Sequence, residues 1–272
     1  MNGSRQRPAP YHIVPGSVDS HFHSLVMDSR GLDAAHILSD CFEAGLAYGL
    51  DISVSLDDFS ERRRRLAAFD RVFLTAGYHP SATDTHTYEA VETELRARLH
   101  EEGVVALGEI GLDQYRDYGD PARQTELFVA QVELARELDL PVVVHNRDAD
   151  RHILDIFRTH PPTRESVMHC FSADAGYAAQ YLELGFTLSF GGNVTYKRSQ
   201  HIREAARITP ADRLLVETDA PFLAPQPVRG RPNHPGFVGY TYEFLAELRG
   251  ESSVEELART VAGNFERIFL KS

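Results

Sequence analysis

Apolar segments that end in potential metal ligands constrain this chain more than any other feature. Five such segments recur along the sequence, and each presents an imidazole or a carboxylate as its apolar run ends. Side chains of this kind, delivered to one end of a parallel sheet, can share divalent cations in the way that metal-assisted hydrolysis requires. The candidate ligands are His21, His23, Glu109, His145, His169 and Asp219.

Runs of strand length alternate with helical patterns along most of the chain. The runs are continuously apolar, as expected for strands buried on both faces, and Gln124–Leu138 carries one apolar stripe at helical spacing. This alternation predicts an α/β fold, a single (β/α)8 TIM-type barrel with its metal site at the C-terminal face of the strands. The predicted strands are Ser17–Asp19, Asp51–Leu56, Val72–Tyr78, Val104–Glu109, Pro141–His145, Ser166–His169, Thr187–Phe190 and Leu214–Glu217.

The remaining segments complete a one-domain organisation. Residues 1–16 are expected to form a flexible N-terminal extension, and residues 17–272 the barrel domain. The linker after the first strand and Ala220–Val238 are expected to be long loops, and the basic run Glu61–Arg65 to be the wet face of a helix rather than a nucleic-acid patch. An open doubly wound sheet is the alternative fold, but it would not gather groups from five separate strands around one point. Helices are predicted at Tyr88–His100, Gln124–Leu138, Ala173–Leu184, Lys197–Ile208, Tyr240–Arg249 and Val254–Phe269.

Composition excludes several classes of protein. There is no run of 18 apolar residues, so no membrane span is expected. The two cysteines, Cys41 and Cys170, lie far apart in apolar contexts, which favours free thiols in a reducing cytoplasm. The formal net charge of -12 argues against a protein that coats nucleic acid through a broad positive surface. This negative charge is compatible with a local phosphate site that binds the end of a DNA strand or a small phosphodiester.

The ligand candidates differ in how strongly each one points to a metal. His21 and His23 are two residues apart, so on a strand both imidazoles face the same side and can clamp one ion. Glu109 lies in an apolar, glycine-flanked strand, where it needs a cation, a buried arginine or a proton. His145 or His169 alone would more often be a satisfied core histidine, but with Glu109 they form a plausible second ligand set.

Three catalytic roles follow from the same positions. Asp219 could bind the first ion and act as general base, with Glu217 as the competing candidate. Glu109 could bridge two ions, and His79 could donate to a phosphate oxygen, with anchoring of its own loop as the alternative role. Arg147 and Arg229 are predicted to bind substrate, because guanidinium groups suit bidentate phosphate contacts. Asp19, on the same strand face as His21, could orient a ligand.

Seven ordered motifs, spanning about Val18 to Phe269, resemble the TatD family of metal-dependent hydrolases. That resemblance implies a binuclear site in which His21, His23 and Asp219 hold one ion, His145 and His169 hold the other, and Glu109 bridges them. It also implies hydrolysis of phosphodiester bonds in DNA, often as a magnesium-dependent 3′ exonuclease on single strands. The motifs are Val-Asp-Ser-His-Phe-His, Ala-Gly-Tyr-His-Pro, Gly-Glu-Ile-Gly-Leu-Asp, Val-Val-Val-His-Asn-Arg-Asp-Ala, Met-His-Cys-Phe-Ser, Glu-Thr-Asp-Ala-Pro-Phe-Leu and Arg-Gly-Arg-Pro-Asn.

The chain departs from the family pattern on the substrate side. Ser81 follows Gly-Tyr-His-Pro where family members often carry another histidine, and Gly191-Gly192-Asn193 replaces the more typical serine-glycine turn. Two divalent ions are expected, and the nitrogen-rich ligand set suits zinc, manganese or iron better than magnesium. An amidase, lactonase or phosphotriesterase on the same barrel is the alternative enzyme, and a non-catalytic metal-binding partner protein is the alternative from another class.

Overall fold

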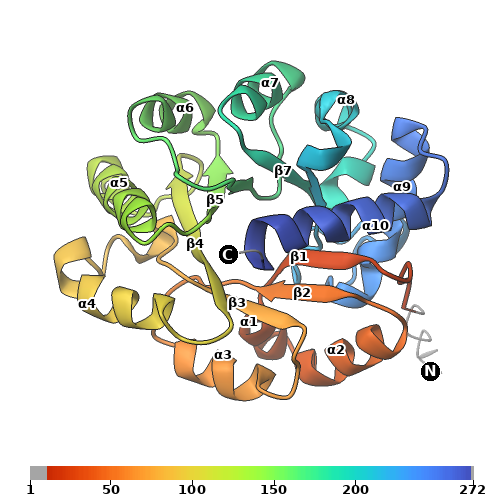
Figure 1. Cartoon of the computed structure of the whole chain (residues 1–272), viewed down its shortest axis with the longest axis horizontal. Coiled ribbons are helices and arrows are strands. Elements are labelled where there is room, and N and C mark those ends of the chain that lie inside the picture. Colours follow the sequence, from red (N-terminus) through yellow and green to blue (C-terminus); the bar gives the residue numbers. More distant parts are fainter. Residues whose placement is uncertain (1–10, 271–272) are drawn as a thin grey trace, which may run out of the picture.

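Eight parallel strands form one sheet in the computed structural model, which describes residues 11–270 (Figure 1). The strands follow one another in sequence order, from the first to the eighth. Short continuous runs of valine, leucine and isoleucine suit such strands, because helices cover their outer face and barrel side chains their inner face. The strands are β1 (Val18–Phe22), β2 (Tyr48–Asp51), β3 (Val72–Ala76), β4 (Val104–Asp113), β5 (Val142–Arg147), β6 (Val167–Met168), β7 (Thr187–Phe190) and β8 (Leu214–Val216).

The sheet closes where its first and last strands meet. A parallel bridge joins Phe22 to Ala220, and the Asp219 N–H donates to the His21 carbonyl over 2.9 Å. The molecule is therefore a (β/α)8 barrel, as predicted, and not an open doubly wound sheet. Because all strands run in the same direction, their C-terminal ends share one face of the barrel.

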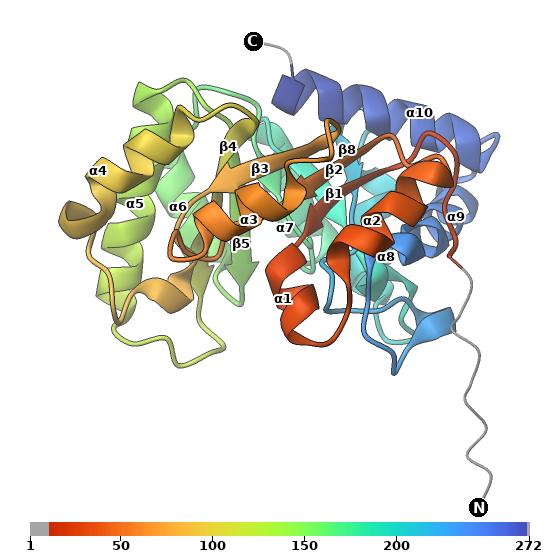
Figure 2. The same cartoon turned by 90° about the horizontal axis from the view of Figure 1, so that it is seen from below.

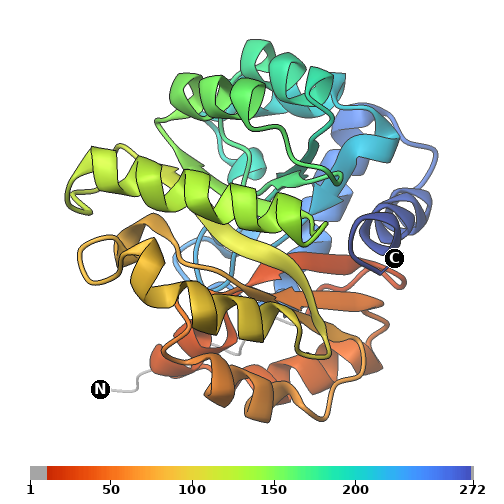
Figure 3. The same ribbon diagram turned by 60° about the vertical axis from the view of Figure 1, so that its left-hand side comes forward.

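Helices surround the barrel and supply the outer wall of its core. Figures 2 and 3 show this layer from two further sides, with the C-terminal helix α10 lying against β1. The helices are α1 (Ser24–Ser29), α2 (Ala34–Glu43), α3 (Phe59–Leu66), α4 (Tyr88–Leu99), α5 (Pro121–Glu137), α6 (Asp150–Thr159), α7 (Ala175–Glu183), α8 (Gln200–Ile208), α9 (Val238–Arg249) and α10 (Val254–Phe265). Within residues 11–270, none has the length and apolar character needed to cross a bilayer.

Two sequence predictions about the first quarter of the chain are wrong. The second strand ends at Asp51 and does not begin there, because the apolar residues Ile52 and Leu56 are buried in the loop that follows it. The linker after β1 is not a long loop but holds α1 and α2. The α2 helix begins at a capping residue, Asp33, whose side chain accepts the His36 N–H.

Arg62 corrects the interpretation of the basic run as a wet helix face. Its side chain is buried in α3, and its Nε lies 2.7 Å from Oδ2 of Asp51, which is itself buried. The other carboxylate oxygen of Asp51 accepts the Ser24 N–H at 2.7 Å. This N–H is one of the unpaired donors at the start of α1. The ion pair therefore fixes the helix that begins directly after His23.

The segment before β1 packs against the loop that follows β8. Residues 1–10 of the predicted extension lie outside the described residues. Within residues 11–16, Val14 is buried, and the His12 N–H donates to the Gly236 carbonyl over 2.6 Å. The predicted loop Ala220–Val238 contains two 3-10 turns, η4 (Gln226–Val228) and η5 (Pro235–Phe237), and the last predicted helix changes at Glu266 into a π-helical turn, η6 (Glu266–Leu270).

Candidate metal centre

The six predicted metal ligands meet at the C-terminal face of the barrel. They come from five strands that are spread over the whole sequence. His23, His169 and Asp219 lie just beyond the ends of their strands, and His21, Glu109 and His145 lie in the C-terminal halves of β1, β4 and β5. Because the strands are parallel and form a closed ring, side chains near their C-terminal ends come close together in space. The side chains brought together are those of His21, His23, Glu109, His145, His169 and Asp219.

One group of donors forms around the junction of β1 and β8. The Nε2 atoms of His21 and His23 are 3.2 Å apart, and Oδ1 of Asp219 lies 3.5 Å from the His23 Nε2 and 3.8 Å from the His21 Nε2. Burial holds the pKa of His21 well below its usual value, so this imidazole is neutral. Two nitrogens and a carboxylate oxygen at these distances fit a shared cation.

Buried Asp19 fixes the backbone that carries Asp219. Its carboxylate accepts the Thr218 N–H at 2.8 Å and the Thr218 hydroxyl at 2.6 Å. Asp219 itself has a φ of 56°, in the left-handed region that non-glycine residues rarely adopt. The hydrogen bonds between Asp19 and Thr218 thus stabilise an unfavourable backbone conformation at Asp219. This conformation turns the Asp219 carboxylate toward the histidines.

Glu109 occupies the middle of the ligand set. Its Oε2 lies 2.9 Å from Nε2 of His169, 3.6 Å from Nε2 of His21 and 3.8 Å from Nδ1 of His145. Burial alone would raise the pKa of this carboxyl, but the surrounding imidazoles hold it well below its usual value. An ionised carboxylate placed between two histidine groups has the position of a bridging ligand.

Asp113 is a member of the site that sequence reasoning missed. Its Oδ2 lies 3.4 Å from Nε2 of His145, while its Oδ1 accepts the Tyr115 and Arg116 N–H groups. Burial opposes ionisation, but the His145 hydrogen bond and these N–H groups lower the pKa of Asp113 to about 2. It orients the His145 ring so that Nδ1 faces Glu109. Strand parity could have found it, because Asp113 is four residues after Glu109 on β4.

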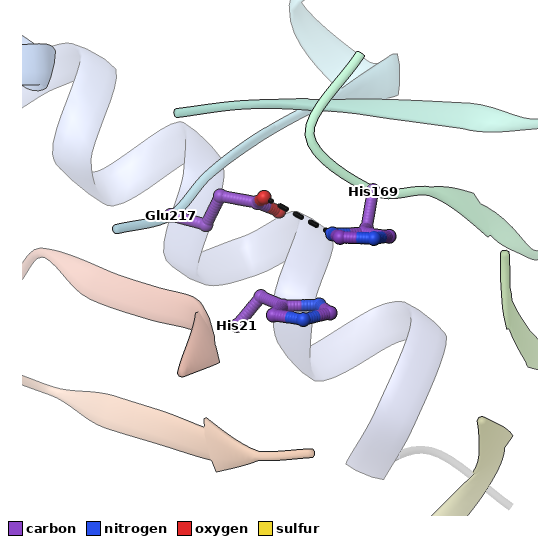
Figure 4. Close-up of side chains that lie close together, drawn as sticks. All are labelled: His21, His169 and Glu217. Atoms are coloured by element: carbon purple, nitrogen blue, oxygen red, sulfur yellow. Dashed lines mark hydrogen bonds and ion pairs between the residues drawn. The ribbon is translucent and has the colours of Figure 1, made fainter. Parts of the chain in front are cut away.

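Glu217 stands behind His169. Figure 4 shows its carboxylate directed at the His169 ring, and Oε1 lies 3.4 Å from Nδ1. The His21 ring stacks on His169 with a centroid separation of 3.9 Å. Complete burial raises the pKa of Glu217, although His169 opposes that shift. Glu217 therefore contacts Nδ1 of His169, and the other ring nitrogen, Nε2, faces Glu109.

His79 has a defined tautomer. The Ser81 N–H donates to its Nδ1 over 3.0 Å, so the ring hydrogen resides on Nε2, which lies 4.0 Å from Oε1 of Glu109. Burial lowers the pKa of His79 to about 3, and the ring is neutral at physiological pH. His79 thus presents an N–H to the cleft, and Ser81, the departure from the family pattern, contributes to its orientation.

A cleft of about 660 Å³ leads from solvent to these groups, and Arg147 lines it. The other predicted substrate-binding residue, Arg229, does not line the cleft. Its guanidinium lies 4.1 Å from the centre of the Tyr196 ring. Sequence reasoning missed Arg30 and Phe222, which line the same cleft.

The donor set fits divalent cations. Within residues 11–270, Nδ1 of buried His21 has no hydrogen-bond partner, and three groups of side chains place their donor atoms within 4.8 Å of one another. Nitrogen and carboxylate donors in this proportion suit zinc, manganese or iron. The three groups are His21, His23 and Asp219; His79, Glu109 and His145; and His21, His169 and Glu217.

Comparison with known proteins identifies the family. A family model described as TatD related DNase matches residues 18–270. This chain belongs to that family. The metal-dependent hydrolase YcfH of Escherichia coli K12, whose name marks it as uncharacterized, is similar to it, with 40% identity over 256 residues that make up 93% of this chain and 95% of YcfH.

One further sequence relative and one solved structure are similar to this TatD-family chain. It is 37% identical over 206 residues to a protein of Erwinia tasmaniensis named 3′-5′ ssDNA/RNA exonuclease TatD, covering 74% of this chain and 79% of that one. The crystal structure of YJJV, a TatD homologue from Escherichia coli, superposes with a TM-score of 0.86 and 27% identity, covering 94% of this chain and 99% of YJJV. The chain is thus a member of a family of metal-dependent hydrolases with candidate metal-binding clusters.

Proposed function

We propose that this protein is a deoxyribonuclease that hydrolyses phosphodiester bonds from the 3′ end of DNA at a centre for two divalent ions. The observation that carries the proposal is the position of Glu109, whose Oε2 faces both His21 of one donor group and His145 and His169 of the other. Two ions sharing this carboxylate would supply Lewis-acid activation of the phosphodiester and of the attacking water.

The ligands divide between the two ions according to the side of Glu109 on which they lie. His21, His23 and Asp219 would hold the ion near the junction of β1 and β8. His145 and His169 would hold the second, since their facing nitrogens are 3.4 Å apart. Zinc, manganese or iron is the expected occupant, and magnesium, which prefers oxygen ligands, is expected to bind more weakly.

Protein side chains would accept the proton of the attacking water and stabilise the negative charge on the phosphate oxygens. Asp219 would accept the proton of the attacking water, because its carboxylate lies at the cleft wall and is partly accessible. The neutral His79 would donate its Nε2–H to a phosphate oxygen, and the Arg147 guanidinium would contact another. Arg229, which does not line the cleft, would contact a more distant part of a longer substrate.

The name of the Erwinia relative supports a nucleic-acid substrate. The lactonase or phosphotriesterase alternative is disfavoured because those barrels often bridge their metals with a carboxylated lysine on the fourth strand, and β4 (VVALGEIGLD) contains no lysine. A non-catalytic metal-binding protein would retain the same ligands, and only an activity measurement separates it from the enzyme.

The test pairs elemental analysis with two assays of the metal-loaded protein. Wild type is expected to contain two ions and to hydrolyse both bis-(p-nitrophenyl) phosphate and a 5′-labelled single-stranded oligonucleotide. His169→Ala is expected to lose one ion and activity together, whereas the exposed His201→Ala retains both. Unchanged cleavage by His169→Ala defeats the proposed site, and two bound ions with no hydrolysis by wild type favour the non-catalytic alternative.

A further inference from the structure

Exposed aromatic and aliphatic side chains gather around the mouth of the cleft. Among the described residues, only Tyr115, Ile208, Phe222 and Leu223 are large hydrophobic side chains with high exposure, at 62%, 47%, 38% and 36%. Phe222 and Leu223 line the cleft directly, and Tyr115 is the neighbour of the lining residue Arg116. A folded protein rarely leaves such side chains grouped in water unless the patch has a function.

An arginine guanidinium group lies over each of the two exposed aromatic rings, Phe222 and Tyr115. The Arg30 guanidinium lies 4.4 Å from the centre of the Phe222 ring, and that of Arg147 lies 4.1 Å from the centre of Tyr115. Among residues 11–270, neither arginine forms an ion pair with a carboxylate. Arginines on the outer helices, such as Arg96, are paired with glutamates instead. Positive charge is therefore left uncompensated at the cleft mouth of an acidic protein.

The two arginine–aromatic pairs lie on opposite sides of the barrel mouth. Arg30 follows α1 and Phe222 follows β8, so this pair lies at the junction of β1 and β8. Tyr115 follows β4 and Arg147 ends β5. In the ring order β1 to β8, the β4–β5 edge is opposite that junction. The metal ligands lie between the two pairs, and so does any phosphodiester bound to them.

This arrangement matches one class of ligand. An unpaired base has a flat face that stacks on an aromatic ring, and its adjoining phosphate is neutralised by an arginine. In a duplex, the bases stack on each other and cannot reach either ring. A small phosphodiester bound at the centre would offer no base to either ring.

We propose that Arg30 with Phe222 and Arg147 with Tyr115 form two base-stacking platforms, one on each side of the phosphodiester to be cut. The substrate is then a single-stranded polynucleotide whose terminal base occupies one platform and whose preceding base occupies the other. This inference rests on the proposed function, because it assumes that a phosphodiester is bound at the metal centre.

Binding of a single-stranded oligonucleotide tests the platforms. The probe is an eight-nucleotide single strand with phosphorothioate linkages, which slow cleavage, and a 5′ fluorescein, titrated with Mn²⁺-loaded protein and followed by fluorescence anisotropy. Phe222→Ala and Tyr115→Ala are each expected to raise Kd roughly ten-fold, the effect of losing one stacked base. Ile208→Ala is the matched control, because the exposure of Ile208 lies between those of Tyr115 and Phe222 but the residue lies on α8, and the Kd of this variant should equal that of wild type.

Abasic probes separate stacking from other contacts. Replacing the last or the preceding base by an abasic residue should weaken binding to wild type by a similar factor. It should have little further effect on the variant that lacks the matching ring. A blunt duplex should bind weakly and show no sensitivity to Phe222→Ala. Metal content and far-ultraviolet circular dichroism of both variants should equal those of wild type.

The outcomes separate this inference from the proposed function. The inference is overturned if Phe222→Ala and Tyr115→Ala bind the single strand as wild type does, or if abasic residues weaken binding to them as much as to wild type. Preferred binding of the duplex overturns it as well. Failure of wild type to hydrolyse bis-(p-nitrophenyl) phosphate, with platform-dependent binding intact, would instead remove the proposed hydrolytic function and leave a single-strand binding site.

Discussion

Replacing Glu217 with glutamine distinguishes a positioning residue from a general base. Glu217 is fully buried, its Oε1 lies 3.4 Å from Nδ1 of His169, and among the described residues its Oε2 has no hydrogen-bond partner. Glutamine preserves the shape and can still accept from Nδ1 through its carbonyl oxygen. It removes the negative charge that makes the His169 imidazole a stronger donor to a cation.

The expected loss is one of metal affinity. Partners that orient a ligating histidine contribute about 10–100-fold to metal binding, which corresponds to about 1.4–2.7 kcal/mol. The new amide NH₂ takes the place of a carboxylate oxygen that also has no partner, so the free energy of unfolding of the metal-free protein should change little. Glu217→Gln should therefore bind Mn²⁺ 10–100-fold more weakly than wild type.

The measurement is the Mn²⁺ dependence of phosphodiester hydrolysis, with isothermal titration calorimetry of the metal. Glu217→Gln should approach wild-type kcat once Mn²⁺ is saturating, whereas Asp219→Asn should remain inactive. If Glu217→Gln binds Mn²⁺ normally but its kcat stays more than a hundred-fold low at saturation, the assignment is wrong and Glu217 is the base.

Three other outcomes follow from the structure. Arg62→Ala leaves the buried Asp51 carboxylate without its cation and should lower the free energy of unfolding by roughly 3–5 kcal/mol in urea titrations; a loss below 1 kcal/mol would contradict the buried pair. Burial lowers the pKa of His234 from 6.5 to about 4, so the folded state binds fewer protons than the unfolded chain between these values and stability falls as pH drops. His234→Gln should therefore lose roughly 2–3 kcal/mol less than wild type between pH 7 and 4.5, and parallel pH profiles would exclude this explanation. Removing metal with EDTA should lower the melting temperature, and Mn²⁺ at 100 times its Kd should restore about 2.7 kcal/mol of stability per site; an unchanged melting temperature would argue against ions held by the folded state.

The barrel and the convergence of the six candidate ligands were predictable because they depend on local patterns. The spacing of His21 and His23 follows strand geometry, and Glu109, His145 and His169 each lie at the end of an apolar run. A parallel barrel brings all strand ends to one face, so position along each strand was sufficient to predict convergence. The same reasoning extended by four residues would have reached Asp113.

Other features depended on contacts between distant segments. The burial of Arg62 follows from Asp51, and nothing in the basic run distinguishes Arg62 from its exposed neighbours. The pairing of Arg30 with Phe222 brings together the segments that follow the first and last strands of the sheet, which no local pattern reveals. The boundary of β2 was wrong because buried apolar residues continue into the following loop.

The join between β1 and β8 gives the metal centre a mechanical consequence. Along residues 11–270, these strands are bridged at Phe22 and Ala220, and His21 with His23 face Asp219 across the same seam. An ion held by these side chains would link the beginning and the end of the folded ring. Without it, the seam would keep its backbone hydrogen bonds but lose the cross-link between β1 and Asp219, so the metal-free barrel should open more readily there.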